Sequence, residues 1–193
     1  MLDTTRILRL HDTANAYGHD ALHPAPAPEG ALEQLVLDQH LANFELWHCE
    51  DQARDPAASD TAIVAVKRSI DRINQRRNDL VEKIDLALLQ GAPPFPEAPL
   101  HSETPGLIID RLSILSLKLF HTEEQLHRST PEHRELNQRR LLQLNEQRTD
   151  LAACLVHLWQ DVLAGRRRFK LYRQLKMYND PELNPVLYGK SSA

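Results

Sequence analysis

The chain has 193 residues and a net charge of −4, with 23 lysines and arginines against 27 aspartates and glutamates. This length is typical of one domain and is enough to bury a hydrophobic core without disulfide or metal cross-links. Six glycines, twelve prolines and two cysteines exclude a collagen-like chain, a disulfide scaffold and a wholly disordered protein. The N-terminus has no uninterrupted apolar stretch, and no segment approaches the roughly 18 apolar residues of a membrane span. We therefore expect a cytoplasmic protein.

The pattern divides the chain into residues 1–29, 30–165 and 166–193. The first part is predicted to be an amphipathic helix over 3–17, stopped by Gly18, followed by the linker HPAPAPEG (23–30). Proline cannot continue a helix, so this linker separates the first helix from the bundle. The third part is a basic, aromatic extension that we expect to be ordered.

Four long helices are predicted in the middle part. The first covers 30–55, with Leu37, Leu41 and Phe44 on one face, and Pro56 ends it. The second covers 60–90, and the stiff linker PPFPEAP (93–99) follows it. The third covers 105–127 behind the cap Thr104-Pro105, and it is apolar nearly all round. The fourth begins at Ser129-Thr130-Pro131-Glu132.

The second and fourth helices carry apolar residues at heptad-like spacing, which is typical of helices that pack along one another. The two stripes are Ile63, Val66, Ile70, Ile73, Leu80 and Ile84, and Leu141, Leu144, Leu151, Leu155, Leu158 and Val162. No segment shows convincing β alternation. The sequence predicts an all-α protein, an antiparallel four-helix core with an N-terminal helix and a C-terminal extension.

Each stripe is interrupted by an arginine, at Arg77 and at Arg148. A buried guanidinium is costly unless it is paired, so each is either part of a structural ion pair or an anion-binding group inside the bundle. Counting from the connecting turns puts Arg77 level with Asp38. The same count puts Arg148 level with Asp110 and Arg111.

A polar row follows the second helix beside its apolar stripe: Lys67, Asp71, Asn74, Asn78 and Asp85. Asn and Asp are poor helix formers, so their concentration here suggests a role beyond solubility, although a wet flank of the bundle is the alternative. The facing helix carries His48, Glu50 and Asp51 at a similar height. We expect a composite polar pocket of His48, Glu50, Asp51, Lys67 and Asp71.

Candidate roles follow from these residue types. His48 with Glu50 or Asp51 is the predicted acid–base pair if chemistry occurs, with Asp71 as a further catalytic candidate. The candidate ligand-binding residues, with the cations predicted to hold phosphate, are Lys67, Asn74, Arg77, Asn78, Asp110, Arg111, Lys118 and Arg148. No motif assigns a cofactor or a metal.

One alternative is a Mg²⁺-dependent, all-α nucleotide pyrophosphohydrolase. Such enzymes hold the ion with ExxE and ExxD motifs, and Glu82-Lys83-Ile84-Asp85 fits ExxD. The ExxE partner is missing, so Glu82 and Asp85 are metal ligands only under this alternative.

The C-terminal 28 residues are basic, with seven lysines and arginines against two carboxylates, whereas the preceding 165 carry 16 against 25. The net charges are +5 and −9. Four aromatic residues lie in this extension, so it can dock on its own acidic bundle or reach an anionic partner. Its candidate contact residues are Tyr172, Arg173, Lys176, Tyr178, Asn179, Asp180 and Asn184.

Four segments together resemble an uncharacterised bacterial family catalogued as domain of unknown function 4254. They are LWHCEDQARDP (46–56), IDRINQRRNDLVEKID (70–85), TPGLIIDRLSILSLK (104–118) and YRQLKMYNDPELNPVLY (172–188). The resemblance covers roughly 30–188 and implies an all-helical bacterial protein, encoded in some genomes near glycosyltransferases of envelope polysaccharide synthesis. It transfers no catalytic residue.

The residues and the resemblance lead to one expectation with two alternatives. We expect a bundle with an anion-accepting pocket, acting as accessory factor or enzyme on a phosphorylated sugar or nucleotide-sugar in cell-envelope glycan synthesis. The alternatives are a non-catalytic protein that docks a glycosyltransferase, and the pyrophosphohydrolase above. Nucleic acid is not an expected partner, and a homodimer is compatible with the pattern.

Overall fold

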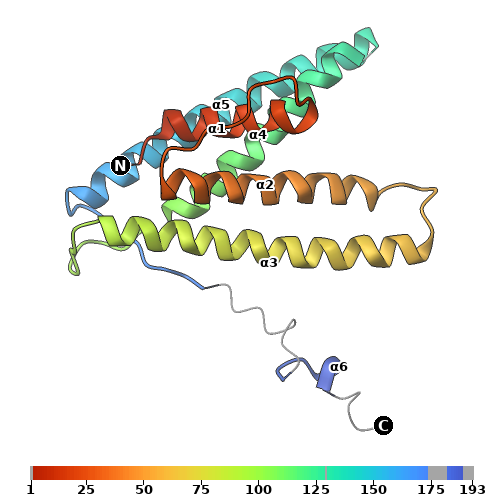
Figure 1. Cartoon of the computed structure of the whole chain (residues 1–193). Coiled ribbons are helices and arrows are strands. Elements are labelled where there is room, and N and C mark those ends of the chain that lie inside the picture. The colour runs from red at the N-terminus through yellow and green to blue at the C-terminus, as the bar shows by residue number, and fades with distance from the viewer. Residues whose placement is uncertain (1, 129, 174–181, 189–193) are drawn as a thin grey trace.

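The computed structural model describes residues 2–128, 130–173 and 182–188, which form five long helices and a final helix of one turn (Figure 1). The helices are α1 (Thr4–His19), α2 (Ala31–Gln52), α3 (Asp60–Gly91), α4 (Pro105–Arg128), α5 (Pro131–Leu163) and α6 (Pro185–Tyr188). The predicted all-α class is confirmed. Across the described ranges, no helix combines the length and the apolar character that crossing a membrane requires.

Local hydrogen bonds explain where the helices begin. Asp3 accepts from the backbone N–H of Arg6, and Ser59 accepts from that of Ala62, so both act as N-caps. Thr104 accepts from the N–H of Leu107, as expected for the predicted cap of α4. Thr130 stands at the N-cap of α5 without a side-chain hydrogen bond, and Pro131 begins the helix.

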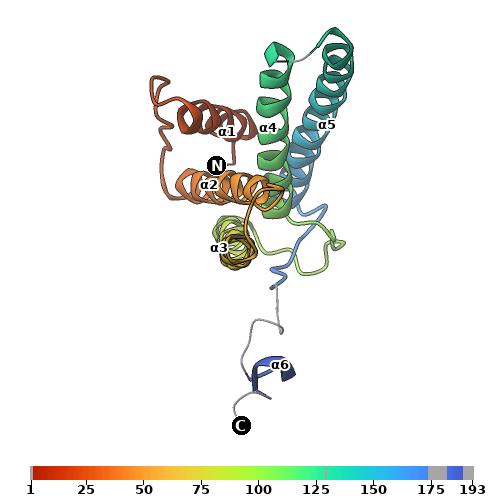
Figure 2. The same cartoon turned by 90° about the vertical axis from the view of Figure 1, so that its right-hand side faces the viewer.

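The long helices pack as two hairpins, with α2 against α3 and α4 against α5 (Figure 1). The two hairpins do not share one axis: where α2 and α3 are seen nearly end-on, α4 runs across the view (Figure 2). Helix α1 lies over α2 and α4 and also contacts α5. Helices α1, α2 and α4 therefore meet one another, and this meeting positions the polar groups discussed below.

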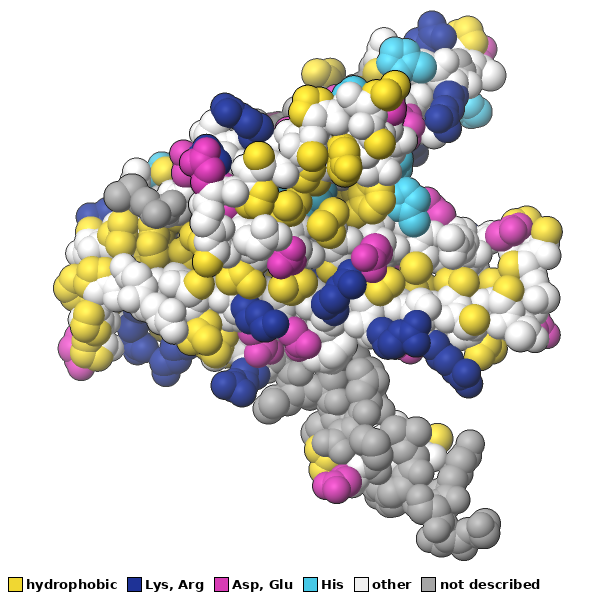
Figure 3. Space-filling model, viewed as in Figure 1, with side chains coloured by type: hydrophobic (Ala, Val, Ile, Leu, Met, Phe, Trp, Pro, Cys, Tyr) yellow, Lys and Arg dark blue, Asp and Glu magenta, His cyan; other side chains and the backbone are white. Residues whose placement is uncertain are grey.

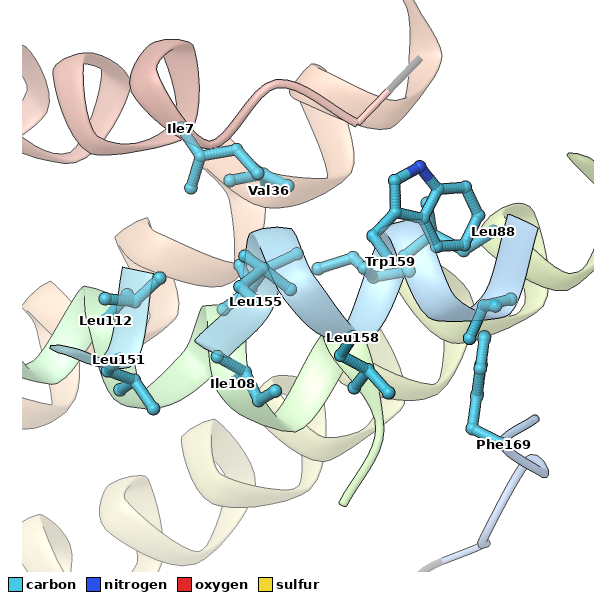
Figure 4. Packing of buried hydrophobic residues seen from close by; sticks show 13 residues of the cluster. Ile7, Val36, Leu88, Ile108, Leu112, Leu151, Leu155, Leu158, Trp159 and Phe169 are labelled. Atoms are coloured by element: carbon cyan, nitrogen blue, oxygen red, sulfur yellow. The ribbon is translucent and has the colours of Figure 1, made fainter. Parts of the chain in front are cut away.

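The core lies where α4 and α5 cross the other helices (Figure 4). Ile108 and Leu112 of α4 pack with Leu155 and Leu158 of α5, and each is at most 5% exposed. Burying one such side chain contributes about 1.5–3 kcal/mol. The predicted stripe of α5 is buried only in its second half, because Leu141 and Leu144 are half-buried.

The start of the C-terminal extension docks against the linker between α3 and α4. His101 N–H donates to the Arg168 carbonyl (2.8 Å), and Arg168 N–H donates to the Pro99 carbonyl (3.1 Å). Phe169 is 4% exposed and belongs to the core cluster. The linker therefore forms a docking site for this part of the extension.

Candidate functional site

A cavity of about 490 Å³ lies between α2, α4 and α5 and is lined mainly by polar side chains. Trp47 of α2 forms one wall, and its ring stacks on His121 of α4 at a centroid distance of 4.8 Å. Lys118 of α4 and Arg140 of α5 bring positive charge, and Asp51 of α2 brings a negative one. Glutamine and asparagine side chains, Thr122 and Leu144 complete the lining. A cavity of this size fits a small polar ligand.

Lys118 and Arg140 differ from the other cations considered for the site. Among the described residues, neither has a carboxylate within ion-pair distance, and Arg140 donates only to the amide oxygen of Asn137 (3.2 Å). The other candidate cations are each paired: Lys67 with Asp71, Arg77 with Asp110, Arg111 with Glu103 and Arg148 with Asp12. An incoming anion therefore meets Lys118 and Arg140 without displacing an internal carboxylate.

Two further cavities adjoin the first one. A cavity of about 420 Å³ shares Trp47 and Asp51 with it and is lined also by Glu50, Arg54 and Arg77. A cavity of about 640 Å³ shares Lys118 with it and includes Arg111. Lys118 stands where the first and the third meet.

Three histidines from three helices meet beside the first cavity, and we call them the histidine cluster: His19 at the end of α1, His48 of α2 and His121 of α4. The His19 ring lies 5.2 Å from the His48 ring and 4.9 Å from the His121 ring, centroid to centroid. One ring nitrogen of each histidine lies within 4.8 Å of a ring nitrogen of each of the other two. Within the described ranges, this is the one group of three such residues with metal-binding spacing.

Close helix packing brings His19 to the cluster. A Cβ on Gly18 would stand 2.7 Å from Cζ of Phe44, so a side chain here would have to displace the Phe44 ring where α1 approaches α2. Phe44 and Phe120 flank the His19 ring. Burial lowers the pKa of His121 below its ordinary value, so this ring is neutral at neutral pH.

The two arginines that interrupt the apolar stripes lie at opposite ends of one chain of hydrogen bonds, which we call the buried polar chain. Arg77 binds both carboxylate oxygens of Asp110, with Nε at 2.7 Å from Oδ1. Arg148 donates to Asp12 (2.7 Å). The partner of Arg77 is therefore Asp110 and not Asp38, and the partner of Arg148 is Asp12 of the N-terminal helix.

Buried side chains connect the two ion pairs. Asn43 donates to Asp110 and to Ser113, and Ser113 lies 2.8 Å from Nδ1 of His40. Nε2 of His40 donates to Asn15, because an amide oxygen only accepts. The remaining links run from Asn15 to Ser116 and from Ser116 to Asp12. Both arginines thus act as structural ion-pair partners.

The predicted composite pocket is not formed as one unit. Glu50 and Asp51 line a cavity with Arg54, to which Glu50 is bonded, and His48 lies in the histidine cluster. Lys67 and Asp71 form an exposed ion pair (2.6 Å). The five residues occupy three places because residues two apart on a helix point in different directions.

The remainder of the predicted polar row lies apart from these cavities. Asn74 and Asn78 are half-buried on α3 and line none of the three adjoining cavities. The face of α3 seen in Figure 3 carries a row of lysines and arginines with acidic side chains between them. This part of the row is the wet flank that was the alternative interpretation.

Asp85, the second member of the ExxD motif, holds the beginning of α4. Its carboxylate accepts from the hydroxyl of Thr104 and from the N–H of Gly106 (2.7 Å), and Asp85 is 3% exposed. A Cβ on Gly106 would stand 2.7 Å from this carboxylate, so glycine is required there. Burial raises the pKa of Asp85 to about 6. Both carboxylate oxygens are engaged within the chain, so the geometry does not favour a magnesium site with Glu82.

The candidate contacts in the extension are described only in part. Tyr172 and Arg173 are exposed, and Asn184 accepts from the N–H of Val186 within α6. The other four candidates, Lys176, Tyr178, Asn179 and Asp180, lie outside the described residues. Docking on the bundle is seen at Arg168 and Phe169, which were not among the candidates.

Sequence reasoning did not single out His19, His121 or Arg140. The local signals were weak: His121 and Glu124 are one helical turn apart, as are Asn15 and His19. Arg140 lies on an exposed face of α5, where periodicity gives no reason to select it. Only the meeting of α1, α2, α4 and α5 gives these residues a common place.

The fold and site define an all-α protein of two crossed helical hairpins, with a polar, cation-lined cavity and an adjoining histidine cluster. The chain belongs to the family described as Protein of unknown function (DUF4254), whose model matches residues 33–171. The match ends before the segment 172–188, which we had included in the resemblance. Searches of curated proteins and of solved structures found no match.

Proposed function

We propose that this is a cytoplasmic bacterial protein that binds a phosphorylated sugar or nucleotide-sugar in the cavity between α2, α4 and α5. It acts as accessory factor or enzyme in cell-envelope glycan synthesis. The observation that carries the ligand class is the pair of cations, Lys118 and Arg140, which face the cavity with no carboxylate partner among the described residues. The pathway is drawn from the resemblance.

The rest of the lining supports this ligand class. Trp47 offers an aromatic wall for a sugar or base, and the amides of Gln125 and Gln143 can bond to hydroxyl groups. Hydrogen bonds between a phosphate and cationic side chains are about twice as strong as neutral ones. The phosphate therefore supplies most of the affinity, and the amides select the sugar.

Thermal-shift and calorimetric titration with glucose 1-phosphate and UDP-glucose test the proposal, with glucose as the uncharged comparison. We expect both phosphorylated compounds to bind and glucose not to bind measurably. Lys118→Ala and Arg140→Ala should each weaken binding about tenfold or more. Arg134→Ala is the matched control, since Arg134 is an exposed arginine on the same helix as Arg140.

Equal loss of binding in Arg134→Ala and Arg140→Ala would show that the effect is general electrostatics. The absence of any response to phosphorylated ligands would contradict the proposal and favour the alternative, a protein that docks a glycosyltransferase.

A further inference from the structure

From the histidine cluster we infer a binding site for a divalent transition-metal ion, Zn²⁺ by its ligand chemistry, held by His19, His48 and His121. This inference does not depend on the proposed function. It stands on which nitrogen of each ring is free, on the burial of two of these nitrogens and on the spacing of the rings.

The hydrogen bonds of the cluster fix which nitrogen carries the proton. Nδ1 of His19 lies 2.8 Å from the carbonyl oxygen of Asn15, and Nδ1 of His48 lies 2.8 Å from that of Phe44. Carbonyl oxygens only accept, so both Nδ1 atoms donate. In the neutral rings the lone pair is therefore on Nε2.

His121 follows the same rule through a carboxylate. Its Nδ1 lies 3.1 Å from Oε2 of Glu124, which leaves Nε2 as the acceptor of the neutral ring. A carboxylate or carbonyl on the far nitrogen is the usual support of a metal-binding histidine, because it fixes the tautomer and raises the basicity of the ligand atom. All three rings carry this support.

The free nitrogens are poorly satisfied within the chain. Nε2 of His19 and Nε2 of His121 are buried and have no hydrogen-bond partner among the described residues. A buried polar atom without a partner is destabilising, so such an atom in a folded protein calls for an explanation. Acceptors gathered in one place need a donor or a cation between them.

The spacing fits a small ion after a modest adjustment. Ligand atoms of the three residues lie within 4.8 Å of one another. Tetrahedral Zn²⁺ with Zn–N bonds near 2.0–2.1 Å requires nitrogens roughly 3.3 Å apart, so small side-chain rotations close the site. Neutral imidazoles suit Zn²⁺ among available ions, whereas Mg²⁺ and Ca²⁺ prefer oxygen ligands.

The surroundings provide an entrance and an open coordination position. His121 belongs both to the cluster and to the wall of the polar cavity, so an ion can reach the cluster from solvent. Three protein ligands are the number found at zinc sites that keep a fourth position for water or another ligand.

Titration of the full-length, EDTA-treated protein with Zn²⁺ and with Co²⁺ tests the inference directly. We expect one ion per chain by calorimetry and by elemental analysis of the dialysed protein, and the visible absorption bands of tetrahedral Co²⁺. Failure of the wild-type chain to retain either ion would overturn the inference without reference to any variant.

Matched variants then locate the site. His48→Ala and His121→Ala should each lower Zn²⁺ affinity at least a hundredfold, and Glu124→Ala about tenfold through loss of the support on Nδ1. The control is His127→Ala, an exposed histidine on the same helix as His121. Circular dichroism must show a folded helical protein for each variant compared.

If His127→Ala and His121→Ala lost Zn²⁺ equally, or if both cluster variants bound as wild type does, the ion would bind elsewhere and the assignment would be wrong. Because the Co²⁺ spectrum is recorded without any sugar or phosphate, its outcome is independent of whether the polar cavity binds a phosphorylated ligand.

Discussion

The buried polar chain and the histidine cluster both join side chains of α1, α2 and α4, and α3 and α5 add the two terminal arginines of the polar chain. The two regions satisfy their polar atoms in opposite ways. In the buried polar chain, each link from Asp110 to Asp12 has a donor facing an acceptor, and an arginine closes each end. In the histidine cluster, Nε2 of His19 and Nε2 of His121 have no donor among the described residues, and ligand atoms of all three rings lie within 4.8 Å of one another. Apart from Nε of Arg148, the polar chain is satisfied within the protein and stabilises the fold, whereas acceptors without donors in one place call for a ligand.

A histidine packed beside the buried polar chain sharpens this distinction. His11 is fully buried, stacks on His40 at 4.7 Å, and has no hydrogen bond to a described residue. Burial lowers its pKa well below the ordinary value, so it is neutral. It is a single ring beside a satisfied one, and its unpaired nitrogens do not converge with those of other rings.

The largest loss of stability is expected from removing Asp110, which pairs with Arg77 at one end of the buried polar chain. Asp110→Ala leaves Arg77 as a partly buried, uncompensated charge, which should lower the free energy of unfolding by about 3–5 kcal/mol. Urea denaturation followed by circular dichroism measures this. The control is Asp71→Ala, which removes an exposed ion pair and should cost less than about 1 kcal/mol. Equal costs would mean that the buried pair contributes no more than a surface pair.

The second prediction distinguishes the two regions by how much Zn²⁺ stabilises variants of each. Zn²⁺ at a hundred times its dissociation constant should raise the free energy of unfolding of the wild-type chain by about 2.7 kcal/mol. The same increment is expected in Ser116→Ala, which alters only the buried polar chain, and none in His48→Ala. A zinc increment that persisted in His48→Ala would remove the contrast between the regions.

A smaller loss of stability is expected from Ser116→Ala, in the middle of the buried polar chain. Ser116 accepts from Asn15 and donates to Asp12, so Ser116→Ala leaves a buried amide without an acceptor. The cost should be about 1–2 kcal/mol in thermal or urea unfolding. Thr149→Ala, which removes an exposed hydroxyl bonded within α5, should change stability by less than about 0.5 kcal/mol. A cost no larger than that of Thr149→Ala would contradict a continuous network.

The smallest expected effect is the change in stability with pH that His40 causes. Burial lowers the pKa of His40 to about 3, against about 6.5 in the unfolded chain. Below pH 6.5 the unfolded chain binds a proton that folded His40 does not, so its stabilising contribution is present above pH 6.5 and lost as pH falls toward 3. The loss should be about 1 kcal/mol per pH unit below pH 6. His40→Gln should reduce this slope, and His133→Ala, at an exposed position, should retain it. An unchanged slope in His40→Gln would contradict the assignment.

Helix positions and caps were predictable because they depend on residues close in sequence. Thr104 and Pro131 begin their helices as expected, and the two stripe interruptions at Arg77 and Arg148 do mark ion pairs. The partners were not predictable from counting within each antiparallel hairpin. Arg77 of α3 pairs with Asp110 of α4, in the other hairpin, and Arg148 of α5 pairs with Asp12 of α1, because the hairpins cross and α1 packs over them.

The candidate site was predicted only in fragments for the same reason. Lys118 was selected and lines the cavity, whereas Arg140 on the partner helix was not. His48 was selected as a base beside Glu50 or Asp51, but those carboxylates lie near Arg54. Helical phase separates Glu50, at i+2, from His48, and Asp51, at i+3, lies 3.9 Å from Nη1 of Arg54, so nearness in sequence did not produce a pair.

The sequence by itself determined the helices, their caps and the local hydrogen bonds that orient each histidine. Nδ1 of His19 and Nδ1 of His48 each bond to a carbonyl one turn earlier in the same helix, an arrangement set by helix geometry alone. Only the tertiary structure decided that these two rings meet each other and His121, which is 102 positions from His19. That meeting depends on the crossing of α1, α2 and α4, and on the close approach at Gly18, because packing between helices sets which distant side chains share one volume.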